Sequence, residues 1–238
     1  MRIALIGYGK MGKAIEEVAV QRGHQIVLKI DQPNLHEFTK ENMANADVAI
    51  EFTSPHSAYD NVKKCLEFGV AVVCGSTGWT DRLEELKNYC QNNNGAFVYS
   101  SNYSVGVNIF FEVNKKLAAL MSPHHDYEVI LEEIHHTAKK DAPSGTAITL
   151  AEDILKQIQR KKHWVNDLSD NPEDLEIISQ RIDPTPGTHS VKYSSVIDNI
   201  EIIHTAHNRT GFATGSVIAA EFLSGRKGFF TMKDVLGL

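Results

Sequence analysis

The residues best suited to chemistry gather between Glu128 and Ala147, in the stretch EVILEEIHHTAKKDAPSGTA. Two adjacent histidines, His135 and His136, end a strand-like run, and Lys139 follows them. An imidazole exchanges protons near neutral pH, and an ammonium group can donate one. The stretch therefore predicts a site at which a bound molecule gains or loses a proton.

A glycine turn and a helix follow the histidines. Pro143-Ser144-Gly145-Thr146 opens a segment in which apolar residues recur at helical spacing from Ala147 to Ile158. We expect the amides of Ser144, Gly145 and Thr146 at the helix N-terminus, with Asp141 or Ser144 as the cap. Such amides attract an anion, which favours an acidic substrate. An ordinary strand edge followed by a capped helix is the alternative, about equally supported by these features alone.

The histidines need a strand to position them. Val129, Leu131 and Glu133 alternate with residues of the opposite face, which is the period of a strand. Strand ends in open α/β sheets present side chains to ligands. Because neighbours on a regular strand face opposite sides, bringing both histidines into one cleft requires a twist at the strand end.

A second candidate site lies at the N-terminus. The turn Gly7-Tyr8-Gly9-Lys10-Met11-Gly12 separates an apolar strand from a helix, and the next strand, 25–30, runs into Asp31. The three glycines allow a tight turn, the approach of a pyrophosphate and close helix packing, and an acid roughly 20 residues on binds ribose hydroxyls. This context favours a dinucleotide site over a purely structural turn.

Strands and helices continue to alternate as far as Tyr103. We expect strands at 47–52, 70–74 and 96–100, hence a parallel, doubly wound sheet of the Rossmann type. The loops after these strands emerge at one edge and could meet one cofactor, although each alone could be an ordinary connection. The loop residues concerned are Thr53, Gly75, Ser76, Thr77, Ser100, Ser101, Asn102 and Tyr103.

The organisation changes beyond Tyr103. A helix around 110–120 precedes the histidine strand, and strand-like runs follow at 175–182, 191–196 and 200–203. The tail from Gly211 reads as one helix that packs back on the first domain. The sequence predicts a dinucleotide-binding domain over 1–103, completed by 209–238, and an α+β domain over 104–208.

Composition excludes several classes of protein. The 238 residues carry a net charge of -6 without a basic block, which argues against nucleic-acid binding. No apolar run approaches the roughly 18 residues of a membrane span. The three cysteines form no Cys-x-x-Cys pair, which favours the cytoplasm. His204 and His207 lack a third ligand nearby, so we predict no metal site.

One long motif is specific to a family. Glu133-x-His135-His136-x-x-Lys139-x-Asp141-Ala142-Pro143-Ser144-Gly145-Thr146-Ala147 resembles the signature of the 4-hydroxy-tetrahydrodipicolinate reductase (dihydrodipicolinate reductase) family. Shorter resemblances follow in the family's order over nearly the whole chain. They are the glycine turn with Met11-Gly12, Phe52-Thr53, Gly75-Ser76-Thr77-Gly78, the stretch from Asn102 to Asn108, Gly187-Thr188-His189, and Arg209 followed by Phe212.

The resemblance implies the NAD(P)H-dependent reduction of (2S,4S)-4-hydroxy-2,3,4,5-tetrahydrodipicolinate to 2,3,4,5-tetrahydrodipicolinate with loss of water, in diaminopimelate and lysine biosynthesis. It also implies a homotetramer built by the sheet of the second domain. By the same resemblance, His135 is the acid/base residue and Lys139 the proton donor. His136, Ser144, Gly145 and Thr146 then hold the carboxylates of the dicarboxylate substrate.

The cofactor preference depends on Asp31. Its charge should repel the 2′-phosphate of NADPH, and Gln32 offers no compensating charge, so NADH is the expected cofactor. Lysines at 10, 13 and 29 could still admit NADPH. Two other functions remain open: a related amino-acid dehydrogenase or imine reductase, and a non-catalytic dinucleotide sensor, which would not need His135 with Lys139.

Overall fold

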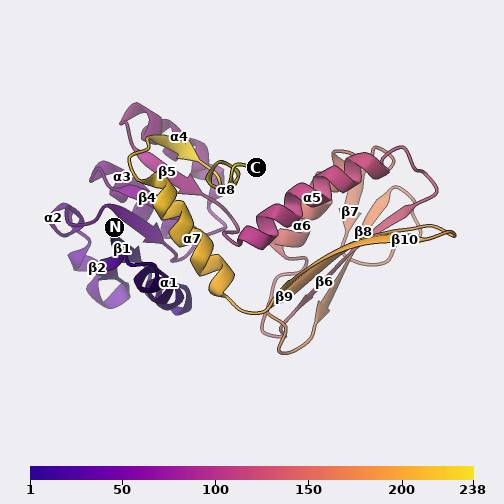
Figure 1. Ribbon diagram of the computed structural model, residues 1–238, viewed down its shortest axis with the longest axis horizontal. Coiled ribbons are helices and arrows are strands. Elements are labelled where there is room, and N and C mark those ends of the chain that lie inside the picture. Colours follow the sequence, from indigo (N-terminus) through magenta and orange to yellow (C-terminus); the bar gives the residue numbers. More distant parts are fainter. The chain divides into compact units, whose positions relative to one another are not determined.

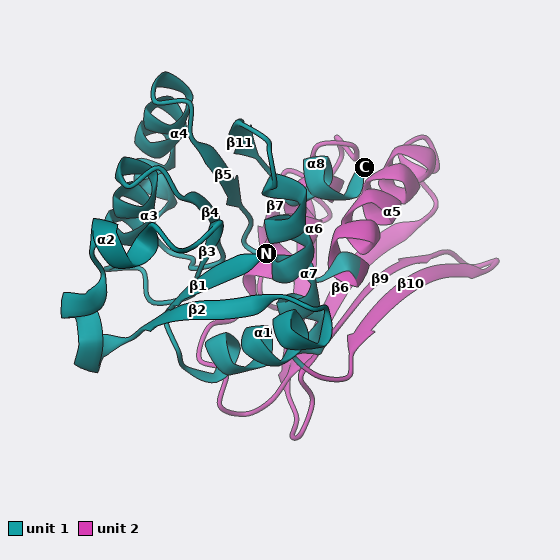
Figure 2. Cartoon of the chain, turned by 60° about the vertical axis from the view of Figure 1, so that its left-hand side comes forward, with its two compact units in different colours: residues 1–105, 209–238 teal, residues 106–208 magenta.

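The structure, a computed structural model, describes residues 1–238 and divides into two compact units. Unit 1 comprises residues 1–105 and 209–238, and unit 2 comprises residues 106–208 (Figure 2). The chain therefore leaves unit 1 once, builds unit 2 as one continuous stretch, and returns to complete unit 1 with its C-terminal residues.

Unit 1 contains a six-stranded sheet with the order β11-β5-β4-β3-β1-β2, in which all neighbouring strands are parallel (Figure 1). The predicted doubly wound sheet is confirmed. Its strands are β1 (Arg2–Ile6), β2 (Gln25–Ile30), β3 (Val48–Glu51), β4 (Ala71–Cys74), β5 (Ala96–Tyr99) and β11 (Gly228–Phe230).

Helices cover both faces of this sheet, which explains why its central strands consist mainly of apolar residues. Ala4 and Ile6 of β1 face one core and Ile3 and Leu5 the other, so alternate residues are buried on opposite sides. The first core is covered by α2 (Lys40–Met43), α3 (Ala58–Glu67) and α4 (Leu83–Asn92). The second is covered by α1 (Lys10–Gln21), α7 (Thr210–Leu223) and α8 (Met232–Leu236).

The C-terminal tail is more elaborate than expected. The predicted helix is present as α7, but the strand β11 and the helix α8 after it were not predicted. Neither were the short 3-10 helices η1 (Gln32–Glu37) and η2 (Thr80–Arg82), nor α2. Segments this short contain too few residues to show a hydrophobic period.

Unit 2 contains a five-stranded mixed sheet with the order β10-β9-β6-β8-β7. Strand β6 (Glu128–His135) lies at its centre, antiparallel to β9 (Gly187–Ser194) and parallel to β8 (Asp174–Arg181). Strands β7 (His163–Val165) and β10 (Asn199–Ala206) form the edges. Helices α5 (Val105–Met121) and α6 (Gly145–Leu155) pack against the sheet around a core that includes Leu131, Leu150 and Ile177.

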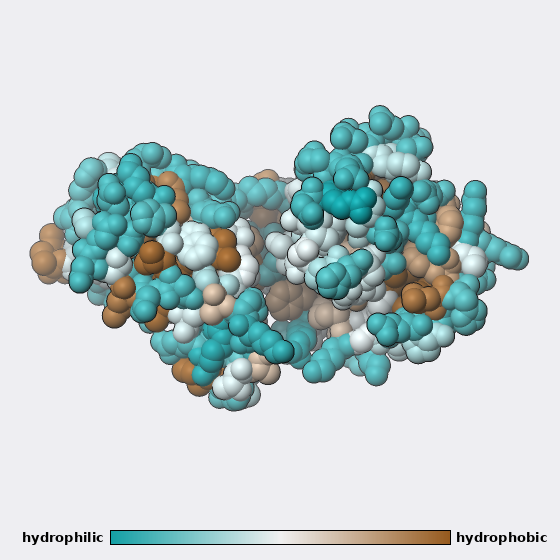
Figure 3. Space-filling model, turned by 180° about the vertical axis from the view of Figure 1, so that it is seen from behind, coloured by the Kyte–Doolittle hydropathy of each residue, from teal (hydrophilic) through white to brown (hydrophobic).

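The β9–β10 hairpin carries exposed apolar residues. Val196 and Ile197 at its tip are exposed, as are Ile200 and Ile203 along β10. Figure 3 shows hydrophobic atoms at this tip, at the left-hand end of the view. The edge strand β10 pairs only with β9, so its outer backbone groups have no strand partner.

No helix of the structure is both long and apolar enough to span a membrane. Cys65, Cys74 and Cys90 are buried and none forms a disulfide.

Candidate active site

The predicted dinucleotide turn connects β1 to α1. Gly7 has a φ of +93°, and a Cβ placed on it would lie 2.1 Å from the carbonyl oxygen of Phe52. A Cβ on Gly12 would lie 2.3 Å from the carbonyl oxygen of Gly7, whereas one on Gly9 would meet nothing within 4 Å. Gly7 and Gly12 thus allow close backbone packing, and Gly9 leaves open space beside the backbone, as a pyrophosphate requires.

The N-terminus of α1 is suited to an anion. Its cap is Gly9, no side chain caps the helix, and its first turn carries no acidic residue. No acidic side chain of this turn therefore competes for its amides, and the helix dipole favours a phosphate there. Lys10 and Met11 belong to this turn. The phenol of Tyr8 is hydrogen-bonded to Glu16, which also binds Lys29 at 2.7 Å.

Asp31 lies beside the glycine turn. The amide of Gly7 donates to the carbonyl of Ile30 at 2.8 Å, which places the residue after β2 close to the turn. Asp31 is exposed, and its carboxylate accepts from the amide of Gln32 at 2.9 Å. It thus stands at the carboxyl edge of the sheet, where ribose hydroxyls can reach it.

The loops after β3 and β4 contact each other. The amide of Thr53 donates to the hydroxyl of Ser76 at 2.8 Å, and Gly75 packs against the ring of Phe52. Beneath them the buried carboxylate of Glu51 accepts from the amide and hydroxyl of Thr53 and, at 3.0 Å, from the thiol of Cys74. Glu51 was not identified from the sequence, because it reads as one residue within an ordinary strand. Thr77, next to Ser76, is exposed at this edge.

The loop after β5 has an exposed part at Ser101 and a buried part at Tyr103. Ser101 is exposed, and the hydroxyl of Ser100 donates to the carbonyl of Asn102 at 2.7 Å. Tyr103 is only 1% exposed, and its hydroxyl donates to the carbonyls of Cys74 and Val98. The ring of Tyr103 therefore supports the loops from inside the unit.

In unit 2, the buried carboxylate of Glu133 is the centre of the histidine site. Glu133 is 0% exposed, because odd-numbered residues of β6 face the helix-covered side of the sheet. Its oxygens accept from the hydroxyl of Ser179 at 2.8 Å and from the guanidinium of Arg181 at 3.2 Å. Burial alone would raise its pKa, but hydrogen bonds from His135, Ser144 and Ser179 outweigh burial and lower the pKa well below its usual range.

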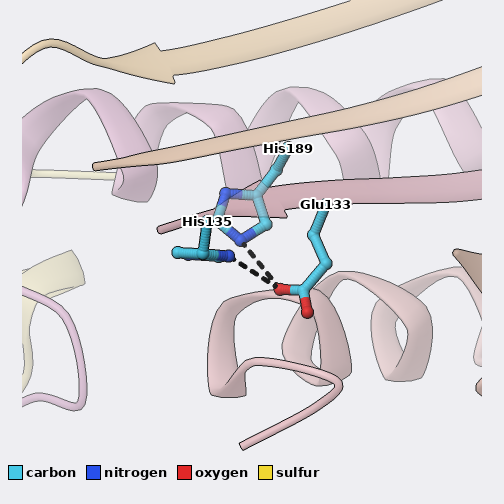
Figure 4. A group of neighbouring side chains, drawn as sticks. All are labelled: Glu133, His135 and His189. Atoms are coloured by element: carbon cyan, nitrogen blue, oxygen red, sulfur yellow. Dashed lines mark ion pairs between the residues drawn. The ribbon is translucent and has the colours of Figure 1, made fainter. Parts of the chain in front are cut away.

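His135 lies on the same face of β6 as Glu133. Its Nδ1 is 3.3 Å from Oε2 of Glu133, and its side chain is 10% exposed. Figure 4 draws this ion pair as a dashed line. Its Nε2 faces Gly187, where a Cβ would lie 3.0 Å away. Strand β6 ends here, so His136 belongs to the following loop and is half-buried. His136 is therefore not a strand residue, and the rule that neighbouring strand residues face opposite sides does not apply to this pair.

His189 completes the cluster and was missed as a site residue. It comes from β9, its ring centroid is 5.1 Å from that of His135, and its Nε2 is 3.1 Å from the hydroxyl oxygen of Ser144. Burial first, and then the neighbouring His135, lower the pKa of His189 to about 3, so it is neutral near pH 7. The only signal in the sequence was its place in Gly187-Thr188-His189, which suggests no role.

The turn before α6 differs from expectation in one respect. Ser144 caps the helix as predicted, its hydroxyl accepting from the amide of Ala147 at 3.2 Å. Its own amide, however, donates to both oxygens of Glu133 at 3.1 Å and is not available to a ligand. The expectation that the Ser144 amide is free at this helix end is therefore wrong. Gly145 and Thr146 form the first turn of α6, and the space beside Gly145 is open.

The lysine loop is attached to the same cluster. Lys139 binds the carboxylate of Asp141 at 2.8 Å, and Lys139 is 21% exposed. The guanidinium of Arg181 donates to the backbone carbonyl of Asp141 at 2.6 Å while also contacting Glu133. Arg181 therefore connects the loop of Lys139 to the carboxylate beside His135.

The cluster also has the composition of a metal site. Donor atoms of Glu133, His135 and His189 lie within 4.8 Å of one another. However, the guanidinium of Arg181 already contacts this carboxylate, and its positive charge opposes a cation there. The contacts of Glu133 with Arg181, Ser144 and Ser179 therefore account for this buried carboxylate without a metal ion. His204 was considered with His207 as a metal pair in the sequence. In the structure, the ring of His204 packs against the ring of Phe110.

Comparison with known proteins identifies the family. Residues 1–103 match the family model "Dihydrodipicolinate reductase, N-terminus" and residues 106–236 match "Dihydrodipicolinate reductase, C-terminus". The 4-hydroxy-tetrahydrodipicolinate reductase of Christiangramia forsetii is 48% identical, over 99% of this chain and 98% of that protein. The enzyme of that name from Methanoregula boonei is 37% identical, over 81% and 75%.

Solved structures agree on the fold. A dipicolinate-bound dihydrodipicolinate reductase from Paenisporosarcina sp. TG-14 has a TM-score of 0.77 and 21% identity, over 97% of each chain. The two-part match to the family model and the relatives of similar length lead to one conclusion: the chain belongs to the dihydrodipicolinate reductase family.

Proposed function

We propose that this protein reduces (2S,4S)-4-hydroxy-2,3,4,5-tetrahydrodipicolinate to 2,3,4,5-tetrahydrodipicolinate and water with NAD(P)H, in diaminopimelate and lysine biosynthesis. The observation that carries the proposal is the contact of Glu133 with His135, beside the N-terminus of α6, in a member of this family. A cyclic dicarboxylate needs anion-binding amides, and its reduction needs a proton donor. Unit 2 provides both kinds of group.

The residues divide into anchoring and proton-transfer groups. The amides of Gly145 and Thr146 and the side chain of His136 hold the substrate carboxylates, and any contact from Ser144 uses its hydroxyl. The nicotinamide supplies the hydride when it is bound. The 4-hydroxyl group leaves with a proton as water, which gives a conjugated imine, and the hydride adds to this imine. The enamine carbon that results then takes its proton from the ammonium of Lys139, while His135 positions or relays that proton through Nε2.

Lys139 must leave Asp141 for this step. The ammonium binds the Asp141 carboxylate, which is 62% exposed, so the pair is open to solvent and easily exchanged. A substrate carboxylate arriving nearby can replace Asp141 as the partner of Lys139. The ion pair thus holds the lysine in place until the substrate binds.

A coupled assay tests the function. Freshly generated hydroxy-tetrahydrodipicolinate is added to the protein, and the absorbance of NADH or NADPH is followed in separate reactions. We expect rapid oxidation of the nucleotide with this substrate and none with aspartate or diaminopimelate. Turnover of those amino acids instead would indicate a related amino-acid dehydrogenase, and binding of NADH without turnover would indicate a dinucleotide sensor.

We propose that NADH is the preferred cofactor. Asp31 presents an exposed carboxylate beside the glycine turn, where it can accept from both ribose hydroxyls and repel a 2′-phosphate. Of the lysines that could offset this charge, Lys29 already pairs with Glu16. A lower dissociation constant for NADPH than for NADH, measured by titration of the protein's fluorescence, would contradict this preference.

We also propose a homotetramer in the cytoplasm. Ile200 and Ile203 on the edge strand β10, with Val196 and Ile197 at the hairpin tip, expose an apolar surface that a second copy would cover. The unpaired thiols fit a reducing compartment. Light scattering at micromolar concentration should give the mass of four chains, and Ile203→Lys should give a smaller species. A monomeric mass for the unmodified protein would contradict the assembly.

A further inference from the structure

We propose that Glu133, held in place by Arg181, is a positioning residue that sets the tautomer of His135 and connects this histidine to the substrate-anchoring turn and to the lysine loop. The inference rests on the proposed acid/base role of His135. Glu133 has no access to solvent and no place to touch a substrate, so it acts only through the groups that it binds.

The two oxygens of the carboxylate have different partners. Oε1 accepts from the hydroxyl of Ser179 at 2.8 Å and from Arg181 at 3.2 Å. Oε2 faces the imidazoles, at 3.3 Å from His135 and 3.7 Å from His189. The amide of Ser144 is shared between both oxygens. Donors on several sides thus prevent the carboxylate from rotating.

The tautomer of His135 follows from this arrangement. A carboxylate surrounded by donors is ionised and can only accept, so Nδ1 of His135, which faces it, carries a hydrogen. Nε2 is then the atom that exchanges a proton. His189, which its lowered pKa keeps neutral, adds no charge beside His135, so Glu133 is the charged group that faces Nδ1.

The same carboxylate fixes the relative positions of three functional groups. It holds His135 through Nδ1, the start of α6 through the amide of Ser144, and the Asp141 backbone through Arg181. Asp141 in turn holds Lys139. A change at Glu133 should therefore disturb proton transfer and substrate anchoring together, while the cofactor turn in unit 1 keeps its own contacts.

The first test is the tautomer in the unmodified full-length protein. Nitrogen-15 NMR of the histidine rings, with His135→Asn used to assign the signal, should show neutral His135 protonated at Nδ1. A signal from His135 protonated at Nε2 instead would overturn the proposal. This measurement does not depend on any variant at Glu133.

The second test is Glu133→Gln. Its carbonyl is expected to take the place of Oε1, where Ser179 and Arg181 donate, which turns its NH₂ group toward Nδ1 of His135. The proton of His135 should then move to Nε2, and kcat should fall roughly 10- to 100-fold with the NADH dissociation constant unchanged. Glu133→Asp, which keeps the charge, should keep the Nδ1 tautomer and recover part of kcat. Glu132→Gln, on the opposite face of β6, is the matched control and should change neither property.

The outcomes separate this inference from the proposed function. If His135→Ala is inactive while Glu133→Gln keeps both the wild-type tautomer and kcat, Glu133 has no positioning role. If His135→Ala itself keeps the wild-type kcat, the proposed acid/base role of His135 is wrong, and the inference fails with it.

Discussion

The α-carbon of Gly187 lies beside the imidazole of His135, so that a methyl group on it would be 3.0 Å from Nε2. Gly187 does not have a positive φ, so alanine fits its backbone and changes only this contact. We predict that Gly187→Ala displaces the imidazole and lowers kcat roughly 10- to 100-fold, with little change in NADH affinity. Steady-state kinetics and NADH titration measure the two effects.

Thr188→Ala is the control for this substitution. Thr188 follows Gly187 in β9 and contacts Thr205 on the neighbouring strand, away from His135. The kcat of the Thr188→Ala enzyme should stay at the wild-type value. Equal losses of kcat in both variants would indicate a general disturbance of β9. The effect of Gly187→Ala would then not be due to its contact with His135.

The stability of the protein should depend on pH through His189. Its pKa is about 3 when folded and near 6.5 when unfolded, so between these values only the unfolded chain binds the proton. Stability is therefore lost as the pH falls below 6.5, by up to about 1.4 kcal/mol per pH unit. Glu133 acts in the same direction but only below about pH 4.5, where its unfolded form begins to bind a proton.

Urea unfolding between pH 5 and 6 separates His189 from Glu133. In this window Glu133 is mostly ionised in both states, so most of the pH dependence of stability that this cluster causes reflects His189. We expect His189→Gln to show a clearly weaker dependence of the unfolding free energy on pH than the wild type. Identical slopes for the two proteins would mean that His189 is not held in its neutral form.

Asp31→Asn should shift the cofactor preference. The substitution keeps a side-chain oxygen that can accept from the amide of Gln32 but removes the charge that repels a 2′-phosphate. The ratio of the NADPH and NADH dissociation constants should move roughly tenfold toward NADPH, or about 1.4 kcal/mol. Glu41→Gln, an exposed acid in α2, should leave the ratio unchanged. An equal shift in both variants would point to net charge alone.

The spacing of apolar residues along the sequence was sufficient to predict the main helices and strands. The strands of the parallel sheet were visible because both of their faces are buried, and β6 because its two faces differ. Strand β9 begins at Gly187, earlier than predicted, because its first residues are small or polar and are buried by the cluster around His135. Tertiary contacts, which leave no local pattern, determined that boundary.

The proton-transfer site was only partly visible in the sequence. His135 and Lys139 stand within one motif, but His189 and Arg181 reach Glu133 from two other strands. The occupation of the Ser144 amide likewise depends on a carboxylate from the neighbouring strand. Pairing of β6 with β8 and β9 brings these residues together, and no spacing along the chain reveals it.

In the proposed reaction, Lys139 donates the proton and His135 assists it. The most direct measurement is kcat for Lys139→Met, which has a side chain of similar length that cannot donate, beside His135→Ala, with hydroxy-tetrahydrodipicolinate and saturating NADH. We predict that each variant loses about 10²- to 10⁴-fold in kcat and binds NADH like the wild type. A Lys139→Met enzyme with near wild-type kcat beside an inactive His135→Ala enzyme would contradict the role of Lys139 as proton donor, because the histidine alone would then be the acid.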